Sequence, residues 1–337
     1  MRTIFKALAE NLKSGNDVVL VTVIATSGAA PRGAGARMLV GEKGYICGTI
    51  GGGAVEYRST EIAIDALKRK TSHEHGFSLT KDDVQNLGMI CGGAVNVFFR
   101  YIPAGDIAAL ALCGKAEEFF EKGLDMWLIY DIAADGGMGL YCDGGEVYPP
   151  DGALFDKTLL SRHPVRTVCD GHDLFIEQIN SSGKVFVFGC GHVAQELVPV
   201  LEHIGFSCVA LDDRKEFASR ALFSMAHDVQ LIDFEHIFDY IEIGSEDYVC
   251  VMTRGHAFDT VIQAQVLKTD ACYIGVIGSA AKKAGVFQKL YEQGFTTADT
   301  DRITSPIGLS IKAETPAEIA ISIAAQLVEF RALRNAT

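Results

Sequence analysis

The apolar positions of this chain change their spacing several times, which predicts alternating helices and strands. The first helix is amphipathic, and it precedes an apolar strand at 18–25, a loop rich in glycine and alanine, and a strand at 36–40. Apolar residues then recur at helical spacing from Ala54, and a further strand follows at 95–101. We therefore expect residues 1–102 to form an N-terminal α/β domain with a mixed arrangement of elements.

The middle stretch, residues 103–182, carries the weakest pattern. It holds a helix-like segment around Phe119 and Phe120, a strand at 127–130, and turns rich in aspartate and glycine. We expect this stretch to be a connecting subdomain.

In residues 183–337, short apolar runs alternate with helical segments. Five runs are typical of buried strands in a parallel sheet, at 185–188, 208–211, 229–231, 248–252 and 273–277. The last helix is marked by Thr315 as N-cap, Pro316 at its first position and Glu318 as the capping-box partner. The pattern predicts a Rossmann-like C-terminal domain with a doubly wound parallel sheet. No internal repeat is evident along the chain.

Composition and charge narrow the class of protein. The chain has 337 residues, 48% of them apolar, and a formal net charge of -13. An acidic chain of this length can bury two cores but has no basic stripe for phosphate backbones, so no nucleic-acid partner is expected. Lys6 and Glu10 interrupt any signal-peptide core, and the run 18–25 is too short for a membrane span, so we expect a cytoplasmic protein. The nine cysteines form no Cys-x-x-Cys pair, which argues against a structural zinc site.

A dinucleotide-binding fingerprint opens the C-terminal domain. The strand at 184–188 runs into a glycine turn in which Gly189 permits the turn, Gly191 lets backbone N–H groups approach a pyrophosphate, and Ala194 allows close packing of helix and strand. Asp212 ends the next strand about twenty residues later, where a carboxylate can accept a ribose hydroxyl proton. This pattern favours nucleotide or phosphate binding. The alternative is a purely structural turn of an α/β domain.

Cys190 lies inside that turn, at the opening of the helix. The positive end of the helix dipole would lower the pKa of its thiol and make it reactive. The alternative interpretation is that the second position of such a turn accepts many residue types.

Two further glycine turns occur in the N-terminal region, at 48–53 and 88–93. Glycines before a helix leave backbone N–H groups unshielded, which suits an anionic ligand, and Cys91 adds a soft thiolate that could ligate a metal or attack a substrate. Arg32 lies in a loop of small residues, where it could pair with a phosphate. The alternative for Arg32 is an ordinary surface charge.

Two C-terminal loops follow predicted strands, where open α/β sheets bind ligands. In the loop 253–259, Asp259 could fix the tautomer of His256, although a single histidine is also a common hydrogen-bonded loop residue. The second loop, 278–283, contains Ser279.

Five ordered motifs resemble the XdhC/CoxI family of accessory proteins for molybdenum hydroxylases such as xanthine dehydrogenase. They lie in both end regions and leave the middle stretch uncovered: Gly48-Thr49-Ile50-Gly51-Gly52-Gly53-Ala54-Val55-Glu56, Cys91-Gly92-Gly93, Gly189-Cys190-Gly191-His192-Val193-Ala194, Tyr273-Ile274-Gly275-Val276-Ile277-Gly278-Ser279, and Pro306-Ile307-Gly308-Leu309 with Ala313-Glu314-Thr315-Pro316. The resemblance implies a chaperone that binds the molybdenum cofactor, as molybdopterin or its dinucleotide form. It also implies that the chaperone supports sulfuration by a cysteine desulfurase and delivers the cofactor to the apo-hydroxylase.

The resemblance also implies roles for individual residues. Arg32 and the amides of Gly51, Gly52 and Gly53 would face anionic groups of the cofactor, and Cys91, beside Gly92 and Gly93, would approach molybdenum or carry sulfur. Cys91 is the candidate catalytic residue of this set, and the place of His256 and Asp259 after a predicted strand adds these two residues to it independently of the resemblance. The C-terminal fold would hold a nucleotide or pterin phosphate through Gly189, Cys190, Gly191, His192, Asp212 and Ser279.

The chain departs from the family pattern at several positions. Where a Thr-His-Asp-His stretch is common, this chain has Thr253-Arg254-Gly255-His256, so only Thr253, His256 and Asp259 correspond. Alanines follow Ser279 in place of the usual arginines. Arg100 stands where a glutamate often follows the Cys91 strand, and Ser310 and Lys312 alter the Pro306 motif. These last differences suggest a subgroup with another form of the cofactor or another client enzyme.

Two other classes of function remain open. One is an NAD(P)-dependent oxidoreductase that uses Gly189, Gly191 and Asp212 to hold NAD(P), or FAD, at the Rossmann-like site. No hydride-transfer residue is identifiable for it, and the N-terminal glycine turns would have no function. The other is a structural subunit of the hydroxylase, which would need no exposed Cys91. For all three classes we expect a homodimer, the commonest symmetric assembly.

Overall fold

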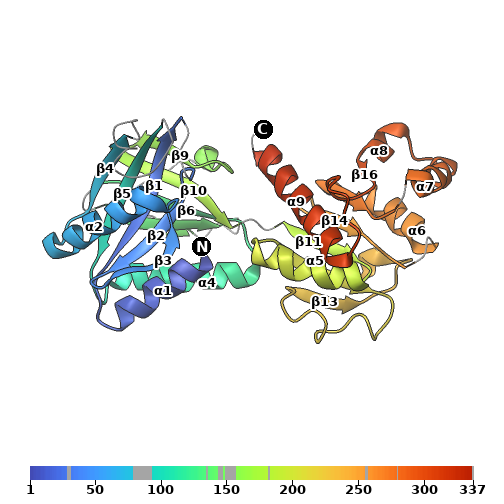
Figure 1. The fold of residues 1–337 in the computed structure, drawn as a ribbon, viewed down its shortest axis with the longest axis horizontal. Helices are drawn as coiled ribbons and strands as arrows, with labels where there is room; N and C mark the ends of the chain where they lie inside the picture. The colour runs from blue at the N-terminus through green and yellow to red at the C-terminus, as the bar shows by residue number, and fades with distance from the viewer. Residues whose placement is uncertain are drawn as a thin grey trace. The chain divides into compact units, whose positions relative to one another are not determined.

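The computed structural model describes residues 1–28, 32–78, 93–133, 136–142, 147–148, 157–180, 183–254, 257–278 and 280–335 (Figure 1). The chain divides into two compact units, Met1–Ser181 and Ser182–Thr337, and each is considered by itself. The boundary lies beside residue 183, where the sequence predicts the start of the C-terminal domain.

Sheet A and its helices make up the first part of the N-terminal unit. Its elements are α1 (Arg2–Lys13), β1 (Val18–Ser27), β2 (Arg37–Gly41), β3 (Gly44–Thr49), α2 (Gly53–Arg69), β4 (His73–Ser78) and β5 (Ala94–Ile102). The strands form a five-stranded antiparallel sheet in the order β3-β2-β1-β5-β4.

Sheet B belongs to the middle stretch of the sequence. Its elements are α4 (Ile107–Lys122), β6 (Met126–Asp131), β7 (Met138–Cys142), β8 (Val147–Tyr148), the 3-10 turn η1 (Lys157–Leu159), β9 (Val165–Cys169) and β10 (His172–Asn180). Its strand order is β8-β7-β6-β10-β9, again antiparallel throughout.

The two sheets have the same topology, so the N-terminal unit is an internal repeat. In residues 2–102 and again in residues 107–180, a helix leads into a central strand, two strands follow outward on one side, and the chain returns as an edge strand and then an inner strand. The sequence shows no internal repeat, but the structure contains one. We call the two parts the first and the second repeat.

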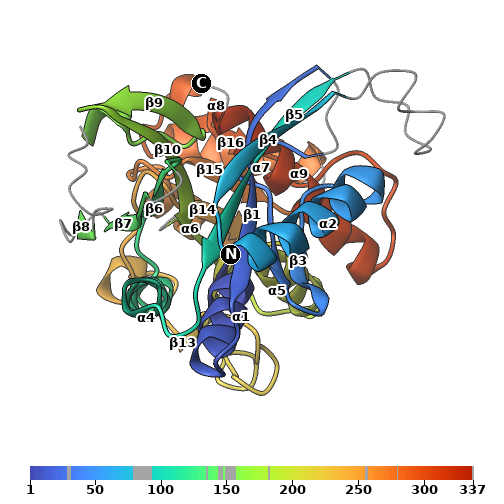
Figure 2. The same cartoon turned by 90° about the vertical axis from the view of Figure 1, so that its left-hand side faces the viewer.

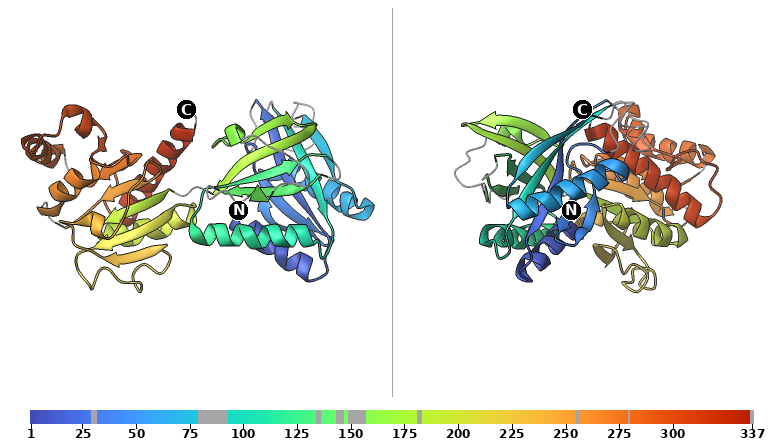
Figure 3. Two further views of the ribbon diagram at one scale, coloured as in Figure 1. Left: turned by 180° about the vertical axis from the view of Figure 1, so that it is seen from behind. Right: turned by 60° about the vertical axis from the view of Figure 1, so that its left-hand side comes forward.

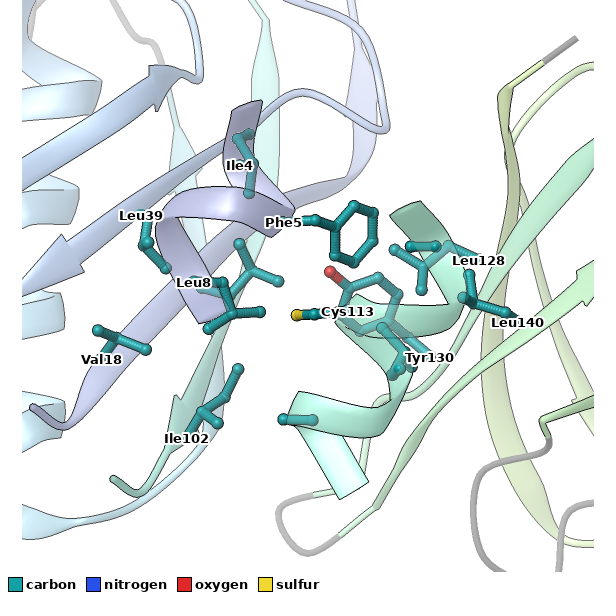
Figure 4. Close-up of a cluster of buried hydrophobic side chains, with 14 of the residues drawn as sticks. Ile4, Phe5, Leu8, Val18, Leu39, Ile102, Cys113, Leu128, Tyr130 and Leu140 are labelled. Atoms are coloured by element: carbon teal, nitrogen blue, oxygen red, sulfur yellow. The ribbon is translucent and has the colours of Figure 1, made fainter. Parts of the chain in front are cut away.

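The two repeats share one hydrophobic core, in which α1 lies against α4 (Figures 2 and 4). The rings of Phe5 and Phe120 are 6.3 Å apart between centroids. Thr22 and Tyr130, each the fifth residue of its central strand, touch through their hydroxyls at 3.3 Å. Contact between corresponding residues is what a local two-fold axis produces. The middle stretch therefore shares its core with residues 1–102.

A buried ion pair also joins the repeats. Arg37, the first residue of β2, pairs through Nη2 with Oε1 of Glu177 on β10, and their side chains are 1% and 6% exposed. The guanidinium also lies 5.5 Å from the centre of the Tyr130 ring. Removing either partner would destabilise the protein, because the other would remain as an unpaired buried charge.

The C-terminal unit is a doubly wound parallel sheet, as the sequence predicts. Sheet C has the order β13-β12-β11-β14-β15-β16, and all its pairings are parallel. Its elements are β11 (Lys184–Phe188), α5 (His192–His203), β12 (Ser207–Asp212), β13 (Asp228–Leu231), the 3-10 turn η2 (Ile237–Asp239), β14 (Tyr248–Val251), α6 (Ala257–Val266), β15 (Tyr273–Val276), α7 (Ala280–Glu292), α8 (Thr297–Asp301), β16 (Ile303–Thr304) and α9 (Pro316–Asn335).

Separate cores cover the two faces of sheet C. Helices α5 and α9 lie side by side on one face, while α6 and α7 contribute to the core on the other (Figures 1 and 3). Helix α9 begins at Pro316, and Glu318 and Thr315 cap it reciprocally, as expected. The strand order changes direction between β11 and β14, which is where open α/β sheets bind ligands. Among the described helices none is long and apolar enough to span a bilayer.

Candidate functional site

Three sequence-predicted features of the first repeat leave sheet A at the same end. Strand β1 ends at Ser27, which pairs with Ala94 at the start of β5, and Arg37 at the start of β2 pairs with Thr49 at the end of β3. The segments carrying Arg32, the turn Gly51–Gly53 and Gly93 connect to these strand ends. Antiparallel pairing thus gathers features that lie far apart in the sequence. Cys91 and Gly92 lie outside the described residues.

The glycine turn before α2 needs its glycines for conformation. Gly51, Gly52 and Gly53 have φ angles of 128°, 72° and 59°, a region that side chains with a Cβ rarely adopt. Oε2 of Glu56 accepts hydrogen bonds from the N–H groups of Ile50 and Gly52, both at 3.1 Å. The Gly51 N–H donates to the hydroxyl of Thr49 at 3.1 Å. The amides of Gly51 and Gly52, predicted to face an anionic ligand, thus already have partners.

The start of α2 retains the donors for an anion. The first-turn amides of a helix, here those of Gly53, Ala54 and Val55, have no carbonyl of their own helix to bond. Arg32 is exposed, and no ion pair involves it within the described ranges. The geometry is compatible with either interpretation of Arg32, a phosphate partner or a surface charge.

The two fingerprint glycines have different roles. Gly189 has φ +99°, and a Cβ there would lie 2.5 Å from the carbonyl oxygen of Met252 and 2.7 Å from Cα of Thr253. Glycine is therefore required at position 189, because the backbone at the end of β14 lies too close for a side chain. Gly191 has φ -72° and ψ -172°, and a Cβ there would meet no atom within 4 Å. The protein itself does not require glycine at 191, and the open space beside it suits an approaching ligand.

Asp212 is fully buried, and its own chain saturates its carboxylate. One oxygen accepts from the backbone N–H and Nε of Arg214, at 3.0 and 2.9 Å. The other accepts from the N–H of Cys190 at 2.7 Å and from Nη2 of Arg214 at 3.0 Å. A ribose hydroxyl could bind this carboxylate only by displacing Arg214. The predicted role of Asp212 as a ribose acceptor does not match this geometry.

Cys190 is a core residue. Its side chain is fully buried, and burial together with the charge of Asp212 raises the pKa of the thiol to about 12. Of the two interpretations of Cys190, burial favours the one in which this position of the turn accepts many residue types and the thiol is not reactive. Its backbone N–H serves Asp212, so neither group of Cys190 faces a ligand.

We expect the Asp212 contacts to make the C-terminal unit sensitive to acid. Burial alone would raise the pKa of Asp212, but hydrogen bonds from Arg214 and the Cys190 N–H outweigh it and hold that pKa below its ordinary value. Because the pKa of Asp212 is lower in the folded than in the unfolded protein, its ionised carboxylate stabilises the fold. This contribution to the free energy of unfolding is fully present above about pH 4, and it is lost as the pH falls through the pKa of the folded state. Asp212→Asn should lower the free energy of unfolding by about 1–3 kcal/mol at pH 7 and remove most of this loss between pH 4 and 2. Urea unfolding followed by circular dichroism at both pH values tests this, and an unchanged acid dependence in the variant would contradict it.

Asp259 and His192 lie at helix starts near the same edge of sheet C. Asp259, in the first turn of α6, is 4% exposed and accepts a 2.5 Å hydrogen bond from the hydroxyl of Thr253. His192 is the exposed first residue of α5. His256 and Ser279 lie outside the described residues, so the predicted pairing of His256 with Asp259 stays a prediction.

A pocket of about 180 Å³ opens at the carboxyl ends of β11, β12 and β14. No sequence motif marks its aromatic wall, in which the rings of Phe234 and Phe258 are 5.5 Å apart at 64°. Arg254 at its rim is exposed and makes no ion pair with any other described residue. An aromatic wall beside a guanidinium suits a flat ring that carries a negative group. The pocket lining is Gly189, Asp212, Asp213, Arg214, Phe234, Thr253, Arg254 and Phe258.

Comparison with known proteins identifies related sequences along the whole chain. Residues 11–77 match the XdhC and CoxI family, and residues 185–327 match the XdhC Rossmann domain. The chain is 26% identical over 328 residues to a probable xanthine dehydrogenase subunit of Bacillus subtilis (strain 168), covering 95% of each chain. It is 23% identical over 340 residues to the molybdenum cofactor insertion chaperone PaoD of Escherichia coli (strain K12), covering 98% of this chain and 88% of that protein.

A solved structure has the same fold. A Bacillus halodurans protein described as a xanthine dehydrogenase superposes with a TM-score of 0.78 at 23% identity, covering 97% of this chain and 95% of the other. At this identity the likeness concerns the fold alone.

Proposed function

Because the chain belongs to the XdhC and CoxI family, we propose that it is a molybdenum cofactor-binding accessory protein for a xanthine dehydrogenase-type molybdenum hydroxylase. The names of its relatives, a cofactor insertion chaperone and a xanthine dehydrogenase subunit, support this assignment. In this proposal the chain binds the cofactor, supports its sulfuration by a cysteine desulfurase and delivers it to the apo-hydroxylase, acting as a homodimer in the cytoplasm.

The observation that carries the proposal is the open space at Gly191 beside the pocket of sheet C. A phosphate at the start of α5 would fill the space that a Cβ would otherwise take, and it would meet the first-turn amides of that helix. A ring system would lie against Phe258, which Phe234 supports from the core, with Arg254 near its negative group. These features fit a phosphate-bearing pterin or its dinucleotide form, which would bring molybdenum to the protein.

The same geometry argues against an oxidoreductase that uses NAD. NAD binding needs Asp212 as an acceptor for the ribose, and Arg214 already occupies both of its oxygens. It does not argue against NADP, because an arginine at this position suits a ribose 2′-phosphate. Proposed roles in the N-terminal unit remain for Arg32, for the start of α2 at Gly53 and for Cys91, which would approach molybdenum or carry sulfur.

One purification tests the proposal. The protein is isolated anaerobically from cells that make the cofactor, and bound molybdenum, pterin and NAD(P) are measured for the wild type, Cys91→Ser and Cys47→Ser. We expect molybdenum and pterin in near-equal amounts in the wild type and Cys47→Ser, and only background in Cys91→Ser. Cys47 is a suitable control because it is half-buried on β3 and burial raises the pKa of its thiol. Stoichiometric NAD(P) without molybdenum or pterin would instead establish the oxidoreductase.

A further inference from the structure

A cysteine, a histidine and an aspartate meet at one end of sheet B, outside the sites described above. Cys169 ends β9 and His172 begins β10, and only Asp170 and Gly171 connect them. These two residues have φ angles of 48° and 85°, typical of the tight two-residue hairpin turn. Cys169 and His172 are consequently directly paired across the hairpin.

The pairing register places all three side chains on one face of the sheet. Directly paired residues share a face, and so do residues two apart on one strand. Cys169 pairs with His172, and Asp131 pairs with Leu174, two residues further along β10. Cβ atoms of directly paired residues are about 4.5–5.5 Å apart, so the side chains of Cys169 and His172 are neighbours on this face. Cys169 is half-buried against a small cluster on this face made of Ile129, Tyr141, Leu174 and Ile176.

A buried carboxylate holds the imidazole. Nδ1 of His172 lies 2.6 Å from Oδ2 of Asp131, whose side chain is 6% exposed, while His172 is 33% exposed. The other oxygen of Asp131 accepts from the N–H of Ala133 at 3.1 Å. Because a carboxylate only accepts, it favours the proton on Nδ1 and leaves Nε2 as the basic nitrogen. A thiol, a base and an orienting carboxylate form the arrangement that activates a cysteine nucleophile.

We propose that Cys169 is a second reactive thiol of this protein, activated by His172 and Asp131, and that it accepts a sulfur atom from a persulfide. Nε2 of His172 takes the thiol proton, and the thiolate attacks the outer sulfur of a persulfide R–S–SH. The S–S bond of the donor breaks, Cys169 becomes Cys169–S–SH, and the released thiolate takes the proton back from His172. Atoms and electrons balance without an oxidant. The inference that Cys169 accepts sulfur rests on the proposed role in sulfuration. The inference that its thiol is reactive rests on the neighbouring His172 and Asp131 alone.

Among the described residues, other charged groups also lie near Cys169, His172 and Asp131. Lys157 lies over the Tyr141 ring at 5.3 Å, and Nη1 of Arg100 lies 3.4 Å from the carbonyl oxygen of Asp131. Asp170 is in the connecting turn, and Asp173 is engaged by Arg166. His172 is thus the group placed to take the thiol proton.

The first test is chemical and does not depend on the cofactor. The full-length protein is treated with iodoacetamide from pH 5 to 9, and alkylation of each cysteine is followed by peptide mass spectrometry. We expect Cys169 to react at least about tenfold faster than Cys47 at pH 7, and His172→Gln to remove that advantage and shift its pH profile upward. Asp131→Asn should give an intermediate loss. Equal rates at Cys169 and Cys47, or an unchanged profile in His172→Gln, would overturn the proposal.

The second test concerns the cargo. Glutathione persulfide is added to the same proteins, and the mass of the Cys169 peptide is measured. One added sulfur on Cys169 in the wild type, and its loss in His172→Gln, is the expected result. Rapid alkylation without sulfur transfer would overturn the assignment of a sulfur acceptor. Because neither test involves molybdenum, failure here is distinguishable from failure of the proposed cofactor binding.

Discussion

Replacing Glu177 with glutamine is expected to destabilise the N-terminal unit by about 3–5 kcal/mol, because it leaves the Arg37 guanidinium charged, buried and unpaired. For a unit of this size, the corresponding fall in Tm is roughly 6–20 °C. The chain has a single tryptophan, and it is Trp127 on β6, in the second repeat. Its fluorescence during urea unfolding therefore reports on the N-terminal unit.

Two further variants show whether the loss comes from an unpaired charge. The double variant Arg37→Met, Glu177→Met removes both charges and should recover much of the lost stability, since apolar replacements of buried pairs are often neutral or better. Arg166→Ala removes ion pairs with Glu74 and Asp173, in which all three side chains are about one-third exposed, and it should cost less than Glu177→Gln. A double variant as unstable as Glu177→Gln would show that the loss is a matter of packing.

Replacing Gly189 with alanine is expected to destabilise the C-terminal unit by roughly 2–6 kcal/mol, from backbone strain at φ +99° together with the collision with Met252 and Thr253. Circular dichroism during urea unfolding measures the loss. The Trp127 transition should not change, because the tryptophan lies in the other unit.

Gly191→Ala is the matched variant two residues away. Its φ of -72° suits alanine and its Cβ would meet only open space, so its stability should stay within about 1 kcal/mol of the wild type. The methyl group would instead occupy the space proposed for a phosphate, and co-purified molybdenum and pterin should fall. A Gly191→Ala protein that is stable and fully loaded would remove Gly191 from the proposed site.

The sequence predicted the C-terminal fold because its signals there are local. Parallel strands buried on both faces appear as short apolar runs, and the turn at Gly189 and the cap at Thr315–Glu318 each lie within a few residues. The repeat of the N-terminal unit has no comparable local signal in the sequence. Its two copies fill the same topology with different residues, such as Thr22 and Tyr130, since a core requires suitable volume and polarity at a position and tolerates different residues there.

The same difference between local and tertiary information applies to the candidate sites. The sequence by itself determined which glycines, arginine and acids stand in turns and at strand ends, because backbone conformation and hydrophobic spacing depend on residues close together in the sequence. Only the tertiary structure decided which of them are available. It buried the Cys190 thiol, bound Asp212 to Arg214, and engaged the amides of Gly51 and Gly52 internally. It also brought Asp131 to His172, 41 positions along the chain, because strand pairing joins residues that no sequence spacing relates.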